Sequence, residues 1–302
     1  MTDFQWIADE DQIFDDSYGG DVTLTQGPYD KNYGKSFTLN TQYTLKLTGA
    51  TTSVDNRGRW QGNFYLIKGK LEIGDQKNGV WLHIGLDGIF NIRSELIMYG
   101  YIQLLGDLEK FQVYDNGMVA ITYHDPSAGI ELSSTFLLED NASMSLLMKG
   151  DSFNGYNGIN IYNNTIQIIN NASFILQTPK IIFNEMSQPF FVLGGFKNED
   201  GNGDVEENAN ITFKDINKKS PIDFTPGSDV PKGIFNFRTT TDDGQSIINK
   251  GKFIIYGVTS GFTLANLKGG GYVSIEGVPQ QNTDNLNYRI SADNTFVEIS
   301  LK

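Results

Sequence analysis

One run of residues in the sequence has a spacing that suits a metal ion. Asp200, Asn202 and Asp204 alternate along the acidic stretch NEDGNGDVEEN, and each side chain supplies oxygen atoms. Oxygen ligands at alternate positions are typical of the first half of a calcium-binding loop. The stretch departs from the EF-hand pattern, because Val205 replaces the sixth-position glycine and Ile211 stands where a bidentate glutamate belongs. We expect weak Ca²⁺ binding by these three residues; the alternative is a solvated acidic side loop.

Other residue types that perform catalysis form no known constellation. The two histidines, His83 and His124, occur in no metal-binding motif, and a catalytic triad would need one of them beside a serine and a carboxylate. Asp242 and Asp243 are paired as in glycosidases, which need converging carboxylates, but the glycine that follows them also fits a loop turn. The segment GPYDKNYGKS ends like a phosphate loop with the wrong spacing. The sequence predicts no catalytic residue.

The elements that would position such residues follow a repeated pattern. A small anchor residue is followed by apolar side chains two and four positions later, with a mostly polar or small residue between them, and the pattern fits ten times. The anchors are Gly69, Gly88, Gly117, Ala142, Ala172, Ala209, Gly233, Gly251, Gly271 and Thr295. In a strand the two apolar positions share one face, and the Asn, Asp or Gly that precedes most of the anchors suits a sharp corner. Each copy therefore predicts a corner followed by a short strand.

The spacing of the anchors predicts the architecture. Successive anchors are 18 to 37 residues apart, and no apolar stripe has the helical period. A fixed corner and strand with side loops of variable length suits an all-β, right-handed parallel β-helix of about ten coils. The alternative is an antiparallel β-sandwich, whose strands also alternate. The constant register of the corner residue favours the β-helix.

The pattern divides the chain into two parts. Residues 1–64 do not fit it and are interpreted as an N-terminal β cap or attachment region, whereas residues 65–302 form the parallel β-helix with a C-terminal cap. Solenoid ends need caps because their strand edges are open. The first 18 residues mix large apolar side chains with an acidic run, so they need a surface to cover. That surface is either the open end of the chain's own solenoid or a neighbouring subunit.

The repeat over 65–302 resembles right-handed parallel β-helix proteins of the pectin-lyase-like, autotransporter-adhesin and phage-tailspike types. The resemblance is one of fold and includes no family-diagnostic motif. Together with the missing catalytic constellation, the acidic composition and the large repeat surface, it implies a non-enzymatic structural or binding protein in an assembled appendage, such as a phage-type fibre or spike or a bacterial surface adhesin. Such a protein would belong to a virion or a cell surface, form a homo-oligomer or larger particle, and contact a surface glycan or host receptor. The alternatives are a polysaccharide lyase or glycosidase of pectin-lyase-like fold, and a sandwich-type carbohydrate-binding module.

The composition of the chain argues against several other classes of function. The chain has 302 residues, a formal net charge of −13 and no cysteine. The absence of Lys/Arg clusters argues against nucleic-acid binding, and the absence of cysteine excludes disulfides and zinc–thiolate sites. No stretch is apolar and long enough for a transmembrane helix. The acidic N-terminus has no apolar core of a Sec signal peptide, so the expectation is either a protein made without Sec export or one whose leader was removed.

Overall fold

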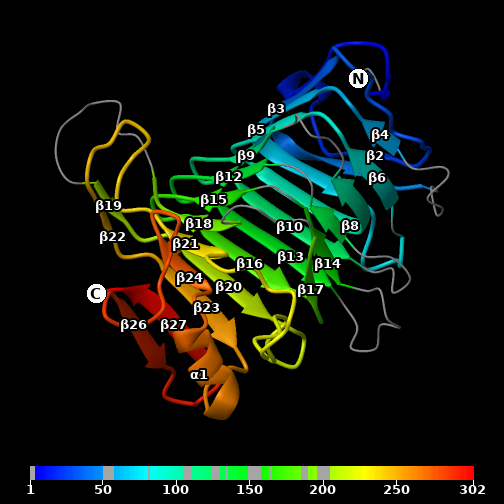
Figure 1. Ribbon diagram of the computed structural model, residues 1–302. Coiled ribbons are helices and arrows are strands. Elements are labelled where there is room, and N and C mark those ends of the chain that lie inside the picture. Colours follow the sequence, from blue (N-terminus) through cyan, green and yellow to red (C-terminus); the bar gives the residue numbers. More distant parts are fainter. Residues whose placement is uncertain are drawn as a thin grey trace.

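The strands of successive turns stack in parallel to form one β-solenoid. The computed structural model describes residues 4–49, 58–80, 82–104, 110–123, 130–132, 135–148, 158–162, 165–184, 190–195 and 205–302. For example, β10 (Met118–Tyr123) pairs in parallel with both β8 (Glu95–Leu104) and β13 (Ser143–Met148). Parallel pairing needs crossover connections, so the antiparallel sandwich is wrong. Figure 1 shows the turns following one another from the blue N-terminal end to the red C-terminal end.

Three parallel walls surround the core. Wall 1 consists of β2 (Val22–Leu24), the second halves of β3 (Ser36–Leu47) and β5 (Asn63–Ile73), the first half of β8, then β10, β13, β16 (Ser173–Gln177), β20 (Asn210–Lys214) and β23 (Lys252–Tyr256). Wall 2 consists of β1 (Gln12–Asp15), the first halves of β3 and β5, β7 (Ile89–Ile92), β9 (Lys110–Val113), β12 (Thr135–Leu138), β15 (Ile166–Ile168), β18 (Phe191–Leu193), β21 (Phe235–Phe237) and β24 (Val273–Ile275). Wall 3 consists of β4 (Gly58–Trp60), β6 (Leu82–Leu86), the second half of β8, β11 (Ile130–Leu132), β14 (Ile159–Ile161) and β17 (Ile181–Phe183). A separate parallel pair joins β19 (Val205–Glu207) to β22 (Ile247–Asn249).

The ten copies of the sequence pattern do not correspond to ten coils. The copy anchored at Gly69 leads into wall 1, whereas the next copy, anchored at Gly88, leads into wall 2. The copy at Thr295 precedes an antiparallel strand, β27 (Phe296–Leu301). The prediction that the ten copies are ten coils is therefore wrong, because similar corners precede two different walls and one turn can carry two copies. The handedness of the coil stays a prediction.

The apolar positions of the pattern form a continuous core. Phe174, Ile211 and Phe253 stand at the same register on three stacked strands of wall 1, and each is at most 1% exposed. All twenty apolar positions of the pattern except Ile275 are buried. The small anchors are required by close backbone approach: a Cβ atom on Gly88 would lie 1.9 Å from the carbonyl oxygen of Gly62. The predicted inward face and small corner are thus confirmed.

The corners into wall 1 carry a ladder of asparagine side chains. The Nδ2 atom of Asn141 donates to Asn116 Oδ1 at 3.5 Å, and Asn171 donates to Asn141 at 3.4 Å. Asn208 continues the ladder with a bond of 3.4 Å to Asn171. These residues precede the anchors, as the pattern requires. The left-handed backbone lies one residue earlier than predicted, for example at Asn170, whose φ is 57°.

Carboxylates in the first 30 residues bind the next turn. The Oδ1 atom of Asp11 accepts from the Ser36 backbone N–H at 2.7 Å, and Asp16 accepts from that of Gln42 at 3.1 Å. The backbone N–H groups of Thr44 and Arg59 donate in the same way to aspartates of the preceding turn. Part of the acidic run is thereby explained, because it satisfies corner N–H groups that have no strand partner. The division at residue 64 stays a prediction, although parallel stacking extends back to β1.

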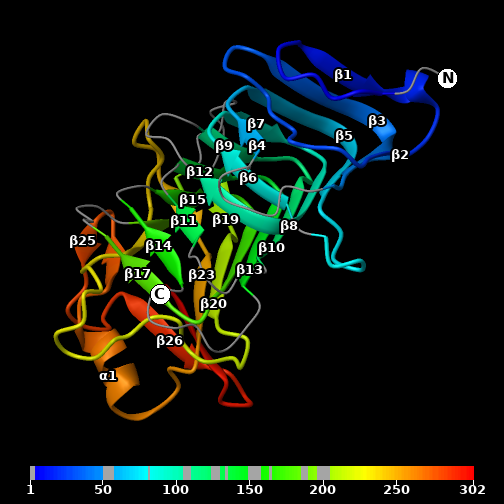
Figure 2. The same ribbon diagram turned by 90° about the vertical axis from the view of Figure 1, so that its right-hand side faces the viewer.

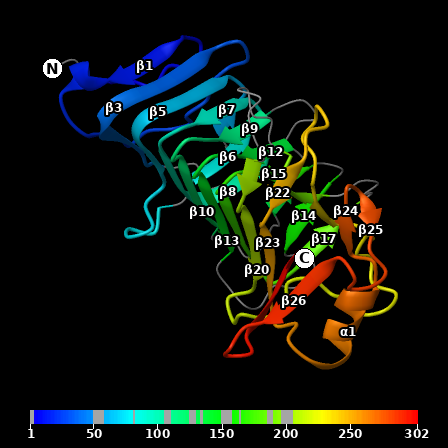
Figure 3. The ribbon, with the colours of Figure 1, turned by 90° about the vertical axis from the view of Figure 1, so that its left-hand side faces the viewer.

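The two ends of the solenoid are closed differently. At the N-terminal end, Phe4 packs edge-on against Phe14 at 5.3 Å, and Trp6 stacks on Trp60 at 5.7 Å between ring centroids. At the C-terminal end, β27 pairs antiparallel with β23 and with β26 (Leu286–Ile290). There β25 (Val278–Pro279) pairs antiparallel with β24, and helix α1 (Gly261–Gly269) lies beside the last strands (Figure 3). The N-terminal aromatic residues therefore cover the chain's own core.

Candidate functional site

The residues predicted from sequence for calcium lie outside the described part of the chain. Asp200, Asn202 and Asp204 fall in the undescribed segment 196–204, as His124 does in 124–129. His83 stands in β6, opposite Tyr101. Among the residues that the structure describes, no group of three His, Cys, Asp or Glu side chains could hold a metal ion. The calcium site therefore stays a prediction.

The paired carboxylates at 242–243 lie in a turn. Asp242 is largely exposed and forms an ion pair with Arg238 at 2.9 Å, four residues earlier. Gly244 has a φ of 85°, and the backbone N–H of Gln245 donates to the Thr241 hydroxyl. This is the loop turn that the sequence offered as its alternative to a glycosidase pair. Each carboxylate is engaged within the turn and not in a shared groove.

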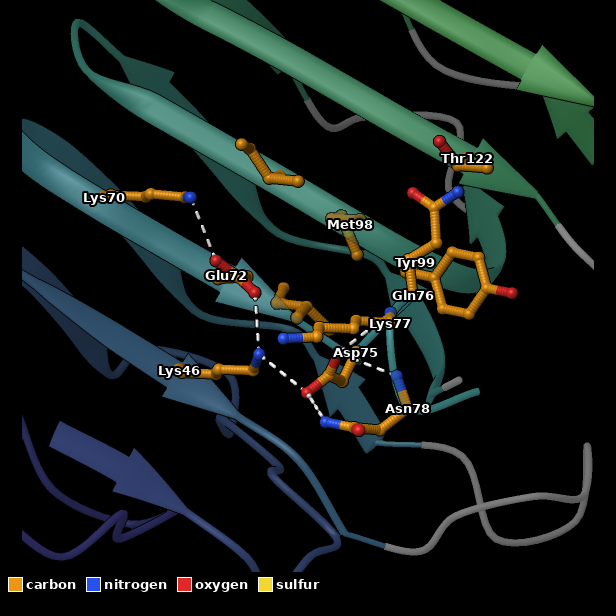
Figure 4. Close-up of a pocket in the computed structure, with 13 residues that line it drawn as sticks. Lys46, Lys70, Glu72, Asp75, Gln76, Lys77, Asn78, Met98, Tyr99 and Thr122 are labelled. Atoms are coloured by element: carbon orange, nitrogen blue, oxygen red, sulfur yellow. Dashed lines mark hydrogen bonds and ion pairs between the residues drawn. The ribbon is translucent and has the colours of Figure 1, made fainter. Parts of the chain in front are cut away.

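A hollow of about 830 Å³ lies at the N-terminal end of wall 1, and we call it the wall-1 niche. It is lined by Lys46, Lys70, Glu72, Ile73, Gly74, Asp75, Gln76, Lys77, Asn78, Ile97, Met98, Tyr99 and Thr122. Strands β3, β5, β8 and β10 form its floor, and the hairpin at 74–80 stands beside it (Figure 4). Apolar and polar side chains thus meet in one concave surface.

Local turn chemistry builds the hairpin of the niche. Asp75 and Val80 exchange backbone hydrogen bonds of 2.5 and 2.8 Å. The Oδ1 atom of Asp75 accepts from the backbone N–H groups of Lys77 and Asn78 at 3.0 and 3.2 Å. Gly79 takes the left-handed conformation at φ 68°, which glycine adopts without strain. The hairpin is therefore specified by the sequence Asp-Gln-Lys-Asn-Gly.

An ion-pair network fixes the charged side of the niche. The Nζ atom of Lys46 lies 2.9 Å from both Glu72 Oε1 and Asp75 Oδ2, and Lys70 Nζ lies 2.9 Å from Glu72 Oε2. Figure 4 shows Lys46 and Asp75 pointing toward each other. These residues stand on the outward face of successive turns, so the network ties β3 to β5. Lys77 adds an exposed cation on the hairpin.

The network keeps both carboxylates of the niche ionised. Hydrogen bonds from Lys46 and then Asn78 lower the pKa of Asp75 to about 2. Burial would raise the pKa of Glu72, but hydrogen bonds from Lys46 and Lys70 outweigh it and hold the pKa below its ordinary value. Hydrolysis by two carboxylates needs one with a raised pKa to act as the general acid. This geometry supports ligand binding better than acid–base catalysis.

Beyond the niche, the outward face of wall 1 carries no charge over three successive strands. The burial of β10, β13 and β16 alternates strictly, so every second side chain faces outward. The outward residues are Met118, Ala120, Thr122, Ser143, Ser145, Leu147, Ser173, Ile175 and Gln177. We call this surface the uncharged strip. Charged side chains resume on either side of it, with Glu95 on β8 and Lys214 on β20.

No family model matches this sequence, and neither the curated proteins nor the solved structures include a match to it. The solenoid fold therefore rests on the parallel pairing itself, and the particular type of β-helix protein stays a prediction. In the described part of the chain, no helix is long and apolar enough to cross a membrane. Sequence reasoning missed the niche, although Glu72 occupies an outward position of the repeat and the turn sequence DQKNG was visible.

Proposed function

We propose that the protein is a non-enzymatic structural and binding component of an assembled appendage, such as a phage-type fibre or spike or a bacterial surface adhesin. The observation that carries the proposal is the uncharged strip on a solenoid with a continuous hydrophobic core. It would act at the surface of a virion or a cell, as a homo-oligomer or within a larger particle. Its ligand would be a surface glycan or another host receptor.

The physical argument concerns the cost of removing groups from water. In a chain of net charge −13, nine neighbouring outward side chains of wall 1 carry no charge. A ligand that covers them displaces water from hydroxyl, amide and apolar groups and leaves no ion without a partner. Hydroxyl and amide side chains such as Thr122, Ser145 and Gln177 lose hydrogen bonds to water when they are covered. They can form equivalent hydrogen bonds to a polyhydroxylated ligand. A neutral saccharide carries no charge of its own and offers many hydroxyl groups, so it suits this surface.

A matched pair of variants tests the proposal. Ile175→Asp places a charge in the middle of the uncharged strip, whereas Leu137→Asp places the same charge on the outward face of wall 2. Both side chains are partly exposed, so the fold should tolerate each change. Binding is measured on immobilised neutral and acidic surface polysaccharides. We expect Ile175→Asp alone to abolish binding to a neutral one; equal binding by both variants, or no binding by the parent, would contradict the proposal.

A further inference from the structure

The N-terminal end of the solenoid presents open strand edges. Within the described residues, β1 and β2 each pair only with β3 of the following turn. Wall 3 is different: Lys31 bridges to Trp60 of the following turn, but on its other side the Asn32 backbone N–H donates to the Ala8 oxygen at 3.1 Å. Figure 2 shows β1 outermost at this end, in dark blue. Each edge strand therefore has one side on which backbone N–H and C=O groups can pair with a further strand.

This end is ordered beneath its open edges. Lys31 is fully buried, and its Nζ atom donates to the backbone oxygens of Ile7 and Glu10 at 2.5 and 3.0 Å. A third bond of 2.8 Å reaches the Gln12 side chain. These bonds hold the segment before β1 against the aromatic residues that cover the core. The edge of β1 is consequently a fixed template and not a frayed terminus.

The edge of β1 is short, at four residues, but it carries no lysine or proline and no bulge, three of the features by which natural edge strands resist pairing. Here β1 reads Gln-Ile-Phe-Asp, and Ile13 is 57% exposed on its outer face. A hollow of about 330 Å³ lies beside it, between the segments 4–7 and 10–13 and Tyr18. The lining of this hollow is mostly polar and includes Glu10 and Asp11, so a basic side chain of an added strand could enter it.

The negative charge of the N-terminal end indicates what kind of strand could pair with β1. Residues 9–21 contain six carboxylates, and no Lys or Arg precedes Lys31, which is buried. Two copies meeting through this end would oppose like charges, which costs free energy. The chain's own C-terminal end cannot stack here as a parallel coil, because β27, β25 and α1 occupy it. Because this end is acidic, charge complementarity favours a basic strand from a different protein as the partner of β1.

We propose that the edge of β1 binds an extended segment of a partner protein by strand addition, and that this segment alternates apolar residues with Lys or Arg. Main-chain hydrogen bonds supply the pairing, the apolar side chains contact Ile13, and a basic side chain enters the adjacent hollow. The basic side chains meet the carboxylates of residues 9–21. The inference rests on the proposed function in one respect only, namely that a component of an assembly needs a point of attachment.

The test uses a fluorescent peptide of about nine residues that alternates valine or threonine with lysine. Controls are the same peptide with a central proline and one with glutamate in place of lysine. Binding to the full chain is measured by anisotropy at two salt concentrations, and the site is located by hydrogen exchange. The matched variants are Ile13→Lys on β1 and Ile290→Lys on β26, which place the same charge on edge strands at opposite ends.

We expect the alternating peptide to bind, to protect β1 amides and to bind less well at higher salt. Ile13→Lys should weaken this binding at least tenfold, whereas Ile290→Lys should not change it. No binding, equal binding by both variants, or protection elsewhere would overturn the inference. Polysaccharide binding by Ile13→Lys is measured in parallel. If Ile13→Lys still binds polysaccharide but no peptide binds the parent, only the strand-addition inference fails and the proposed function is unaffected.

Discussion

Phe64 and Phe90 occupy the same register on consecutive turns of wall 2, with ring centroids 4.8 Å apart and ring planes inclined by 10°. The separation matches the spacing of hydrogen-bonded strands, about 4.8 Å. Phe111 and Phe136 extend the column with centroid distances of 5.5 and 5.2 Å. One residue type repeated at one position therefore stacks along the solenoid axis, so the rings join neighbouring turns as well as filling the core.

The aromatic column predicts a large effect of Phe90→Ala. The side chain is 2% exposed and packs between the rings of the turns before and after it. Truncation leaves a cavity and should lower the free energy of unfolding by about 3–5 kcal/mol. Ile89→Ala is the control, because Ile89 is 38% exposed on the same strand and should change stability little. Chemical denaturation measures both, and similar losses for the two variants would contradict the packing described here.

The left-handed corner predicts a difference between two substitutions of Asn170. Its φ of 57° suits glycine and strains alanine by about 1–2 kcal/mol. Asn170→Gly and Asn170→Ala both lose the side-chain bond to Asp140, so their difference isolates the backbone. We expect alanine to be the less stable variant. At Asn171 the order should reverse, since that residue has no positive φ and glycine there adds only flexibility. Thermal unfolding of the four variants decides this.

The repeat was readable because burial imposes period 2 on every strand. Phe174 and Leu176 are inward and Ser173 and Ile175 outward, whatever wall the strand belongs to. The same generality made it wrong to assign one coil to each copy: corners into walls 1 and 2 obey the same sterics, so Gly69 and Gly88 look alike in sequence. Local pattern specifies the strand and its corner, but the number of strands per turn is a property of the closed coil.

The niche was less predictable because it depends on stacking. Lys46 is 26 residues from Glu72 and 29 from Asp75 in the sequence, and only the register of β3 on β5 brings them together. The turn at Asp75 could have been found from its Asn-Gly dipeptide. The acidic N-terminus was hard to interpret for the same reason, since Asp11 meets its backbone partner on Ser36 only after a full turn.

The network at the niche predicts an acid-dependent loss of stability. The pKa of Asp75 is about 2 in the folded protein and about 3.9 in an unfolded chain. A lowered folded-state pKa stabilises the fold above pH 3.9, and this contribution disappears as the pH falls toward 2. Asp75→Asn removes it, so the difference in stability between parent and variant should shrink between pH 4 and pH 2. A constant difference across that window would show that Asp75 is not coupled to Lys46. Thermal unfolding at intervals of pH measures it.

Calcium binding at 198–208 is predicted from sequence alone. Asp200 and Asp204 would supply carboxylate ligands, with Asn202 between them. Calorimetry with millimolar calcium should give a weak binding signal for the parent and none for Asp200→Ala/Asp204→Ala. The control for net charge is Asp284→Ala/Asp293→Ala, which removes two exposed carboxylates near the C-terminus. Identical traces for the parent and the first variant would remove the site.

Lys31→Met should release the N-terminal segment from the end of the solenoid. Methionine has a similar length, but it donates no hydrogen bond, so the oxygens of Ile7, Glu10 and Gln12 lose a buried partner. Unpaired groups of this kind cost about 1–3 kcal/mol each, and water can reach some of them once the segment moves, so we expect a loss of about 2–4 kcal/mol.

The local nature of the Lys31 effect gives a second readout. Trp6 packs beside Lys31, with Nζ 5.2 Å from the ring centroid, so its fluorescence should shift toward that of exposed tryptophan. Protease should cleave before β1 in the variant and leave the later turns intact. Lys35→Met, at a partly exposed lysine of the same loop, should change neither property. If Lys31→Met keeps the parent's fluorescence and protease resistance, the buried ammonium does not hold the segment, and the aromatic contacts of Phe4 and Trp6 are sufficient by themselves.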